Sequence, residues 1–229
     1  HGGEWIQKKV NDPLFRPIEA NYLWLADQKI AYIEMSRASG IELLKIKERN
    51  PYLTSTFGTG ELILDAIEKG AIEIILTIGG SATNDAGIGM AAALGFKFLN
   101  NEKEELKAIG ESLPLIHSIV PSPLIQKIHS VKFKVITDVQ NPLAGKEGAA
   151  HVFAKQKGAN AEMIKYLDKG LINMQKLISK TEKGNIGAMK GAGAAGGLGA
   201  GAIYFLQAEI ALGAEWLLTK IHFDRAVKK

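Results

Sequence analysis

Small polar residues at 77–85 have a spacing that suits the binding of an anion. In the stretch TIGGSATNDAGIG, an apolar run precedes Gly79, Gly80 and Ser81, and an alanine-rich segment follows. If a strand ends at the glycines and a helix follows, unpaired N–H groups at the helix start lie where the helix dipole favours negative charge. Gly79, Gly80 and Ser81 are therefore candidate ligands of a phosphate or carboxylate. In a purely structural alternative, Ser81 or Thr83 only caps the helix.

Three further side chains have the chemistry to act on a reacting group. Asn84 and Asp85 lie in the same stretch, and Asp138 follows the alternating run 131–137, which predicts a strand. Ligands of open parallel sheets bind beyond the carboxyl ends of strands, so Asp138 and the glycine loop are expected to face one crevice. The alternative is a turn in which Asp138 or Asn141 bonds its own backbone ahead of the next proline.

Three other segments could contact a small anion. Arg37 in EMSRASG and the run TSTFGTGE at 54–61 lie beside expected element ends, and Lys157 in QKG could offer a cation, although most lysines lie on a solvated face. The segment GAGAAG at 191–196 matches the glycine pattern of dinucleotide-binding loops, but no strand precedes it. It predicts close helix packing, or a second helix start that faces an anion.

The composition excludes several classes of site. The 229 residues contain no cysteine, which rules out disulfides, thiolate metal sites and cysteine nucleophiles. The five histidines lack metal spacing, and no Walker loop or G-x-S-x-G motif occurs. The net charge of +4 comes from scattered lysines, so nucleic acid is not an expected partner. The run 191–208 is mostly Gly and Ala and predicts a buried helix, not a membrane span. No signal peptide is visible, and we expect a cytoplasmic protein.

These residues need a frame of alternating strands and helices. The apolar patterns predict strands at 5–10, 19–24, 29–35, 73–78 and 131–137, and helices at 61–70, 82–94 and 160–180. A loop is expected at 184–193 and a glycine-rich helix within 194–218. The sequence therefore predicts the α/β class, with a mixed or mainly parallel sheet flanked by helices and a small antiparallel β piece at the N-terminal end.

Six segments occur in order along the chain: DPLFRPIEANY, IEMSRASGIELL, RNPYLTSTFGTGELI, TIGGSATNDAGIGMAAALG, DVQNPLAGKEGAAHVFAKQKGA and GAGAAGGLGAGA. Together they resemble the type I glycerate kinases, bacterial enzymes that phosphorylate glycerate with ATP. The resemblance spans most of the chain. Lys155 and Lys190 stand where the family often has proline, and Ala86 stands where it often has glycine.

The resemblance implies two α/β domains, one inserted into the other, with the active site in the cleft between them. The family's N-terminal DGGEG segment and its C-terminal TGEG-like segment are not found in this sequence. We therefore expect residues 1–229 to form a single α/β domain that resembles the inserted domain, with half of the cleft absent. On this hypothesis the isolated chain is inactive.

The resemblance also implies ATP and Mg²⁺ as cofactors and glycerate as the small-molecule substrate. Phosphoryl transfer depends mainly on positioning and charge neutralisation. The hypothesis assigns anion binding to the amide groups of Gly79, Gly80 and Ser81, together with Arg37 and Ser39. It assigns the substrate hydroxyl or Mg²⁺ to Asp85 or Asp138. Asn84 and Asn141 would orient these aspartates or the ligand. Two alternatives stay open, a sugar-acid binding module that needs no nucleotide and a scaffold domain without catalysis.

Overall fold

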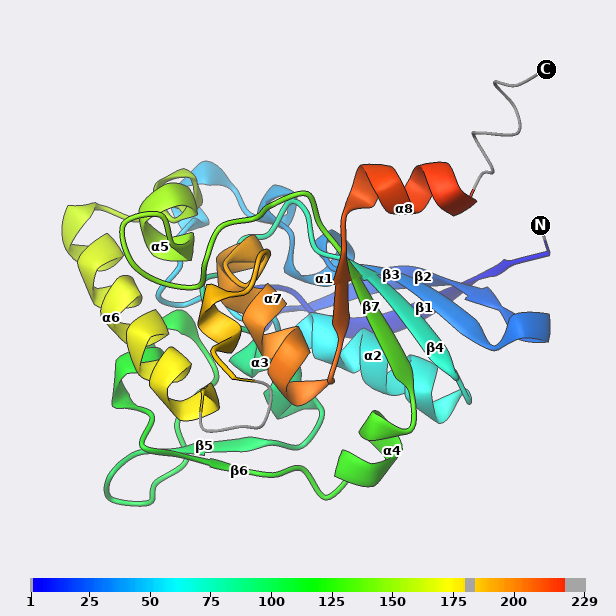
Figure 1. Ribbon diagram of the computed structural model, residues 1–229, viewed down its shortest axis with the longest axis horizontal. Coiled ribbons are helices and arrows are strands. Elements are labelled where there is room, and N and C mark those ends of the chain that lie inside the picture. Colours follow the sequence, from blue (N-terminus) through cyan, green and yellow to red (C-terminus); the bar gives the residue numbers. More distant parts are fainter. Residues whose placement is uncertain (1, 180–183, 221–229) are drawn as a thin grey trace.

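A computed structural model of the chain describes residues 2–179 and 184–220 (Figure 1). The strands are β1 Glu4–Asn11, β2 Pro17–Leu25, β3 Ile30–Glu34, β4 Glu73–Thr77, β5 Lys97–Leu99, β6 Ser118–Val120, β7 Lys132–Ile136 and β8 Glu209–Ala211. The helices are α1 Ser36–Ser39, α2 Phe57–Glu68, α3 Ile88–Ala93, α4 Ile125–His129, α5 Ala149–Phe153, α6 Ala161–Ile178, α7 Ala194–Phe205 and α8 Gly213–Lys220.

Six of the strands form one mixed sheet in the order β1-β2-β3-β4-β7-β8. Strands β1, β2 and β3 pair antiparallel, whereas β3, β4, β7 and β8 run parallel. This arrangement confirms the predicted α/β class and its antiparallel N-terminal piece, which is continuous with the main sheet. A separate pair, β5 with β6, was not predicted. In Figure 1, β7 rises from α4, and its carboxyl end lies on the side of the molecule where α8 begins.

Helix α2 packs against the antiparallel part of the sheet. Its apolar stripe is buried, and on the sheet Tyr22 is buried and donates a hydrogen bond to Asp65 of α2 over 2.8 Å. The helix begins at Phe57, four residues before the predicted start. Gly58 and Gly60, which suggest a loop in the sequence, lie inside it. The backbone of Asn11 passes close to Gly58, and α3 passes close to Gly60. A Cβ atom on Gly60 would lie 2.4 Å from the carbonyl oxygen of Met90.

The predicted helix at 82–94 is wrong in its first half, since α3 spans only Ile88–Ala93. Ala86 and Gly87 have φ angles of 51° and 75°, in the left-handed region that a right-handed helix cannot use. The side chain of Asp85 accepts the amide groups of Gly87 and Gly89 and so fixes this turn before the helix starts. Gly79, Gly80 and Ser81 therefore do not lie at a helix N-terminus, and neither Ser81 nor Thr83 caps the helix.

The C-terminal part contains a strand that the sequence did not predict. The expected glycine-rich helix within 194–218 is divided into α7, β8 and α8, and β8 is only three residues long. Helix α7 is almost entirely buried, as expected for close packing. A Cβ atom on Gly196 would lie 2.1 Å from the carbonyl oxygen of Thr83, so the glycines let α7 touch the 78–87 loop. Within the described residues, no helix is long and apolar enough to cross a membrane.

The long amphipathic helix predicted at 160–180 corresponds to α6. Asn160 caps it, because its side chain accepts the amide of Met163 over 2.9 Å. The last predicted residue, Lys180, lies outside the described residues. In Figure 1, α5 and α6 lie at the end of the molecule opposite to β1 and β2.

The contact between α2 and α3 yields a stability test. Gly60→Ala is expected to lower the free energy of unfolding by about 1–3 kcal/mol, because the added methyl group has no room between the helices. Chemical denaturation measures the change. Gly79→Ala is the matched control, since a Cβ atom there meets no atom within 4 Å and its φ is not in the left-handed region. Equal effects of the two substitutions would contradict the close packing.

Candidate active site

Two cavities at the carboxyl ends of the parallel strands share the loop at Gly79 and Gly80 as a wall. The larger has a volume of about 650 Å³, and its lining includes Arg37 from the segment that follows β3. The smaller has a volume of about 260 Å³, and its lining residues include Ser81, Thr137 after β7, and Lys157. Both lie where ligands of open parallel sheets bind.

The two cavities differ in charge. The larger is lined by three carboxylates, those of Glu19, Glu34 and Glu42, and by one cation. That cation, Arg37, is exposed, and its Nε lies 2.9 Å from Glu34. In the smaller cavity, Lys157 is the one charged residue of the described lining. A small anion is therefore favoured in the smaller cavity.

Lys157 is buried, with 2% of its surface exposed. Its Nζ donates hydrogen bonds to Ser81 Oγ over 2.7 Å and to the carbonyl oxygen of Thr83 over 2.6 Å. An ammonium group has three N–H donors, so one is left for a ligand. Burial lowers the pKa of Lys157 to about 7, against the opposing influence of the Asp85 charge.

A tight turn directs Lys157 inward. The 3-10 helix Lys155–Lys157 ends at Gly158, whose φ of 96° favours glycine. A Cβ atom on Gly158 would also lie 2.1 Å from the carbonyl oxygen of Arg49. The turn thus packs against the 45–49 segment, and it buries Lys157 while Lys155 stays exposed.

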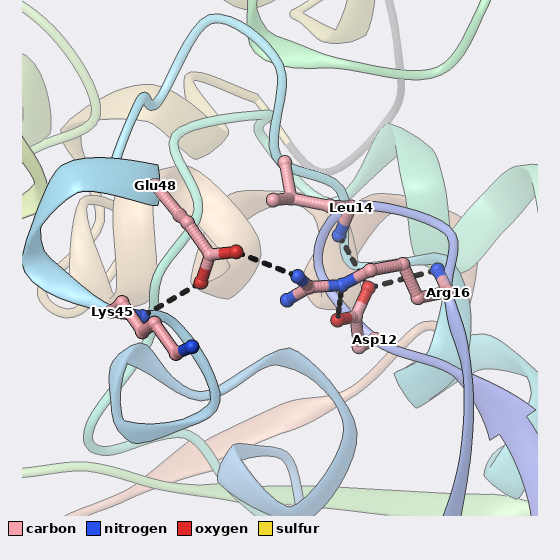
Figure 2. A network of polar contacts seen from close by, with 5 residues as sticks. All are labelled: Asp12, Leu14, Arg16, Lys45 and Glu48. Carbon is pink, nitrogen blue, oxygen red and sulfur yellow. Dashed lines mark hydrogen bonds and ion pairs between the residues drawn. The ribbon is translucent and has the colours of Figure 1, made fainter.

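A polar network holds that segment against the β1–β2 turn (Figure 2). Asp12 is buried, and it accepts hydrogen bonds from the backbone of Leu14 and Arg16 and from the Arg16 guanidinium group. The same guanidinium group reaches Glu48 over 2.8 Å, and Glu48 accepts the amide of Lys45. The network therefore supports the backbone on which the Lys157 turn rests.

Asp85 is fully buried beside this site. It accepts hydrogen bonds from the amide groups of Thr56, Gly87 and Gly89 and from the Thr56 hydroxyl group. That hydroxyl group accepts the amide of Met90, so its own hydrogen points to Asp85. Burial raises the pKa of Asp85, although the four hydrogen bonds oppose the shift. In this structure, Asp85 has no exposed oxygen for a substrate or Mg²⁺.

Ser39 and Asn84 are also buried and line neither cavity. Ser39 shares a hydrogen bond of 2.7 Å with the hydroxyl group of Thr59. Neither the oxygen nor the nitrogen of the Asn84 amide has a partner among the described residues. A buried amide without partners costs about 1–3 kcal/mol, so this position would gain from a bound water or ligand group.

Asp138 and Asn141 lie in the loop after β7. Asp138 is exposed, and its Oδ1 accepts the amide of Gly213 over 2.9 Å at the start of α8. Asn141 donates to the carbonyl oxygen of Glu147 over 2.9 Å. Neither residue lines the two cavities, but the neighbours of Asp138, Thr137 and Val139, line the smaller one. Neither makes the turn contact of the structural alternative, because Asp138 bonds the distant backbone of Gly213 and Asn141 bonds Glu147, which lies beyond the proline.

The structure thus brings only some of the predicted site residues together. Gly79, Gly80 and Ser81 meet at the smaller cavity, and Arg37 lies in the neighbouring one. Lys157 was noted in the sequence only as a possible cation, since its burial depends on a distant segment. Within the described residues, no group of three or more acidic, His or Cys side chains could hold a metal ion.

The same substitution at the two aspartates separates their structural roles. Asp85→Asn is expected to lower the free energy of unfolding by about 3 kcal/mol or more, because an amide cannot accept from all four donors. Asp138→Asn is expected to change it by less than about 0.5 kcal/mol, because asparagine also accepts the amide of Gly213. Urea denaturation tests both, and a harmless Asp85→Asn would refute the role of this carboxylate in the fold.

The pH dependence of stability tests the burial of Lys157. Its pKa is about 7 in the folded chain and near the ordinary lysine value of 10.5 when unfolded. Between these values the unfolded chain binds more protons, so stability rises with pH. The free energy of unfolding of the wild type, minus that of Lys157→Met, is expected to rise from pH 7 to 9 in urea titrations. A difference that stays constant would show that the lysine is solvated.

The comparisons with known proteins agree on one family. The sequence profile of the glycerate kinase family matches residues 1–229. The chain is 44% identical to a glycerate kinase of Halalkalibacterium halodurans and 41% identical to the glycerate 2-kinase of Escherichia coli, and it covers 60% and 57% of their lengths. These alignments include 99% and 95% of this chain. The chain thus spans about three fifths of the length of the curated relatives it matches.

A solved structure, described as glycerate kinase 2 from Salmonella typhimurium LT2, superposes with a TM-score of 0.91 at 39% identity. The match covers 96% of this chain and 59% of that one. The structural and the sequence comparisons therefore agree, and the chain belongs to the glycerate kinase family.

Proposed function

We propose that this chain takes part in the ATP-dependent phosphorylation of glycerate to phosphoglycerate. The observation that carries the proposal is the cavity in which the loop at Gly79, Gly80 and Ser81 meets the buried cation Lys157. Such a cavity selects a small anion, and relatives at 41–44% identity are named glycerate kinases. The cytoplasm, where ATP is available, is the expected compartment.

The active site in this proposal lies between two domains. Residues 1–229 form a single α/β domain that corresponds to the inserted domain, and they supply one wall of the cleft. The support is that the relatives are longer, with about two fifths of their length outside the match. The isolated chain is expected to bind substrate weakly and to release no ADP, whereas robust activity would place the complete site within it.

The residues have separate roles in this site. The amide groups of Gly79 and Gly80, with Ser81, receive the anionic part of the substrate, since no acceptor among the described residues takes up the two glycine amides. Arg37 contacts a phosphate when it leaves Glu34. Behind this surface, Ser39 bonds Thr59, and Asn141 fixes the backbone after β7. The amide of Asn84, which has no partner among the described residues, orients a ligand group or a water.

Asp138 fits the remaining role better than Asp85. Mg²⁺ takes oxygen ligands, keeps several waters and uses one or two carboxylates together with substrate phosphates. Asp138 is exposed, and its Oδ2 accepts no hydrogen bond from the described residues. It would hold the metal or orient the substrate hydroxyl, while Asp85 acts through the loop and Lys157. When bound, Mg²⁺ neutralises the charge of the ATP phosphates.

A kinetic comparison tests the role of Asp138. In the intact protein, Asp138→Asn is expected to lower kcat about 100-fold or more, because it removes the charge that positions the metal or the hydroxyl. ADP release with glycerate and Mg-ATP measures the change. Asp27→Asn, an exposed aspartate in the turn before β3, is the matched control and should leave kcat unchanged. An unaffected Asp138→Asn enzyme would remove Asp138 from the mechanism, and no ADP release by the intact wild-type protein would refute the proposed function.

A further inference from the structure

The smaller cavity suits a ligand the size of glycerate and not a nucleotide. Its volume of about 260 Å³ lies below the roughly 300–1,000 Å³ of pockets that enclose drug-sized molecules. A three-carbon acid fits within such a space, whereas a complete nucleotide does not. The larger cavity, which shares this loop, repels a carboxylate because three glutamates line it.

The charge balance favours a carboxylate over a phosphate. Lys157 and Asp85 are the charged groups that act on one another here, and their charges cancel when the lysine is protonated. Asp85 is the only charged group among the described residues that shifts the pKa of Lys157. A carboxylate adds one negative charge to this pair, and a phosphate adds more. The free amide groups of Gly79 and Gly80 provide partial positive charge for one such anion.

We propose that Lys157 binds the carboxylate of glycerate, with the free N–H of its ammonium group as donor and Ser81 as the group that holds it in place. Two of its three donors are already used by Ser81 and Thr83, so the remaining one has a defined direction. This inference rests on the proposed function and adds the residue that recognises the acid group of the substrate.

Binding by this lysine is coupled to proton uptake. Burial lowers the pKa of Lys157 to about 7 in the empty site, and a bound carboxylate raises it again because opposite charges favour the protonated form. Above pH 7 the Lys157 amine of the empty site is mostly unprotonated, so glycerate binds together with one proton. The affinity for glycerate is then expected to fall by about tenfold per pH unit above 7.

Calorimetry with glycerate alone tests the proposal on the intact protein at pH 6.5, 7.5 and 8.5. The wild type is expected to lose affinity as pH rises, and to take up a proton at pH 8.5 when buffers of different ionisation enthalpy are compared. Lys157→Met is expected to weaken glycerate binding at least tenfold at pH 6.5, to abolish its pH dependence, and to leave ATP affinity unchanged. Lys155→Met is the matched control, because Lys155 lies two residues away and is exposed.

Several outcomes would overturn the inference. Unchanged glycerate affinity in Lys157→Met would exclude a binding role, and weakened binding of ATP or inorganic phosphate in its place would assign the lysine to the phosphoryl group. If Lys157→Met fails to fold, Ser81→Ala offers a milder test, since it removes one acceptor of the ammonium group and should shift the pH profile. None of these results changes the ADP release of the intact wild-type protein. If that protein releases no ADP, the proposed function itself is refuted.

Discussion

One buried carboxylate, that of Asp85, determines how the starts of α2 and α3 meet. It accepts the amide of Thr56, which precedes α2, and those of Gly87 and Gly89 at the start of α3. Helix starts leave amide groups unpaired, and here a single side chain satisfies such groups at two helices. The same negative charge opposes the loss of the proton from Lys157. The frame of the loop and the electrostatics of the cavity therefore depend on one group.

The longer strands β1, β2, β3, β4 and β7 were predictable because their patterns are local. The run at β4 is mostly apolar, and the run at β7 alternates. The structure confirms that these two strands pair in parallel. The start of the helix predicted at 82–94 could not be placed correctly from the sequence. Its first half has a helical pattern, but that pattern does not include the hydrogen bonds that the Asp85 side chain accepts. Once this side chain accepts two amides from its own turn, a left-handed backbone at Ala86 and Gly87 becomes the stable one. The three-residue strand β8 is too short to give a periodic signal.

The candidate site was predictable in part for a related reason. The glycine loop carries its signal in its own residues, and it does line the smaller cavity. The inward position of Lys157 depends on Gly158 packing against Arg49, more than one hundred residues earlier in the chain. No local pattern contains that contact, and a lysine between a glutamine and a glycine is expected to be solvated. Ser39 and Asn84 show the reverse case, because polar residues beside a candidate site turn out to be buried.

The contacts of Lys157 also constrain the order in which the chain can fold. Its hydrogen bonds reach Ser81 and Thr83 across 76 and 74 residues, so the site forms only after segments far apart in the sequence have come together. Contacts of such sequence separation form slowly, because loop closure costs entropy before it gains energy. The amine enters the interior more cheaply without its proton. During synthesis on the ribosome, the anion site can therefore form only after residue 157 has left the exit tunnel. Until then, the loop at Gly79, Gly80 and Ser81 lacks the cation that completes the site.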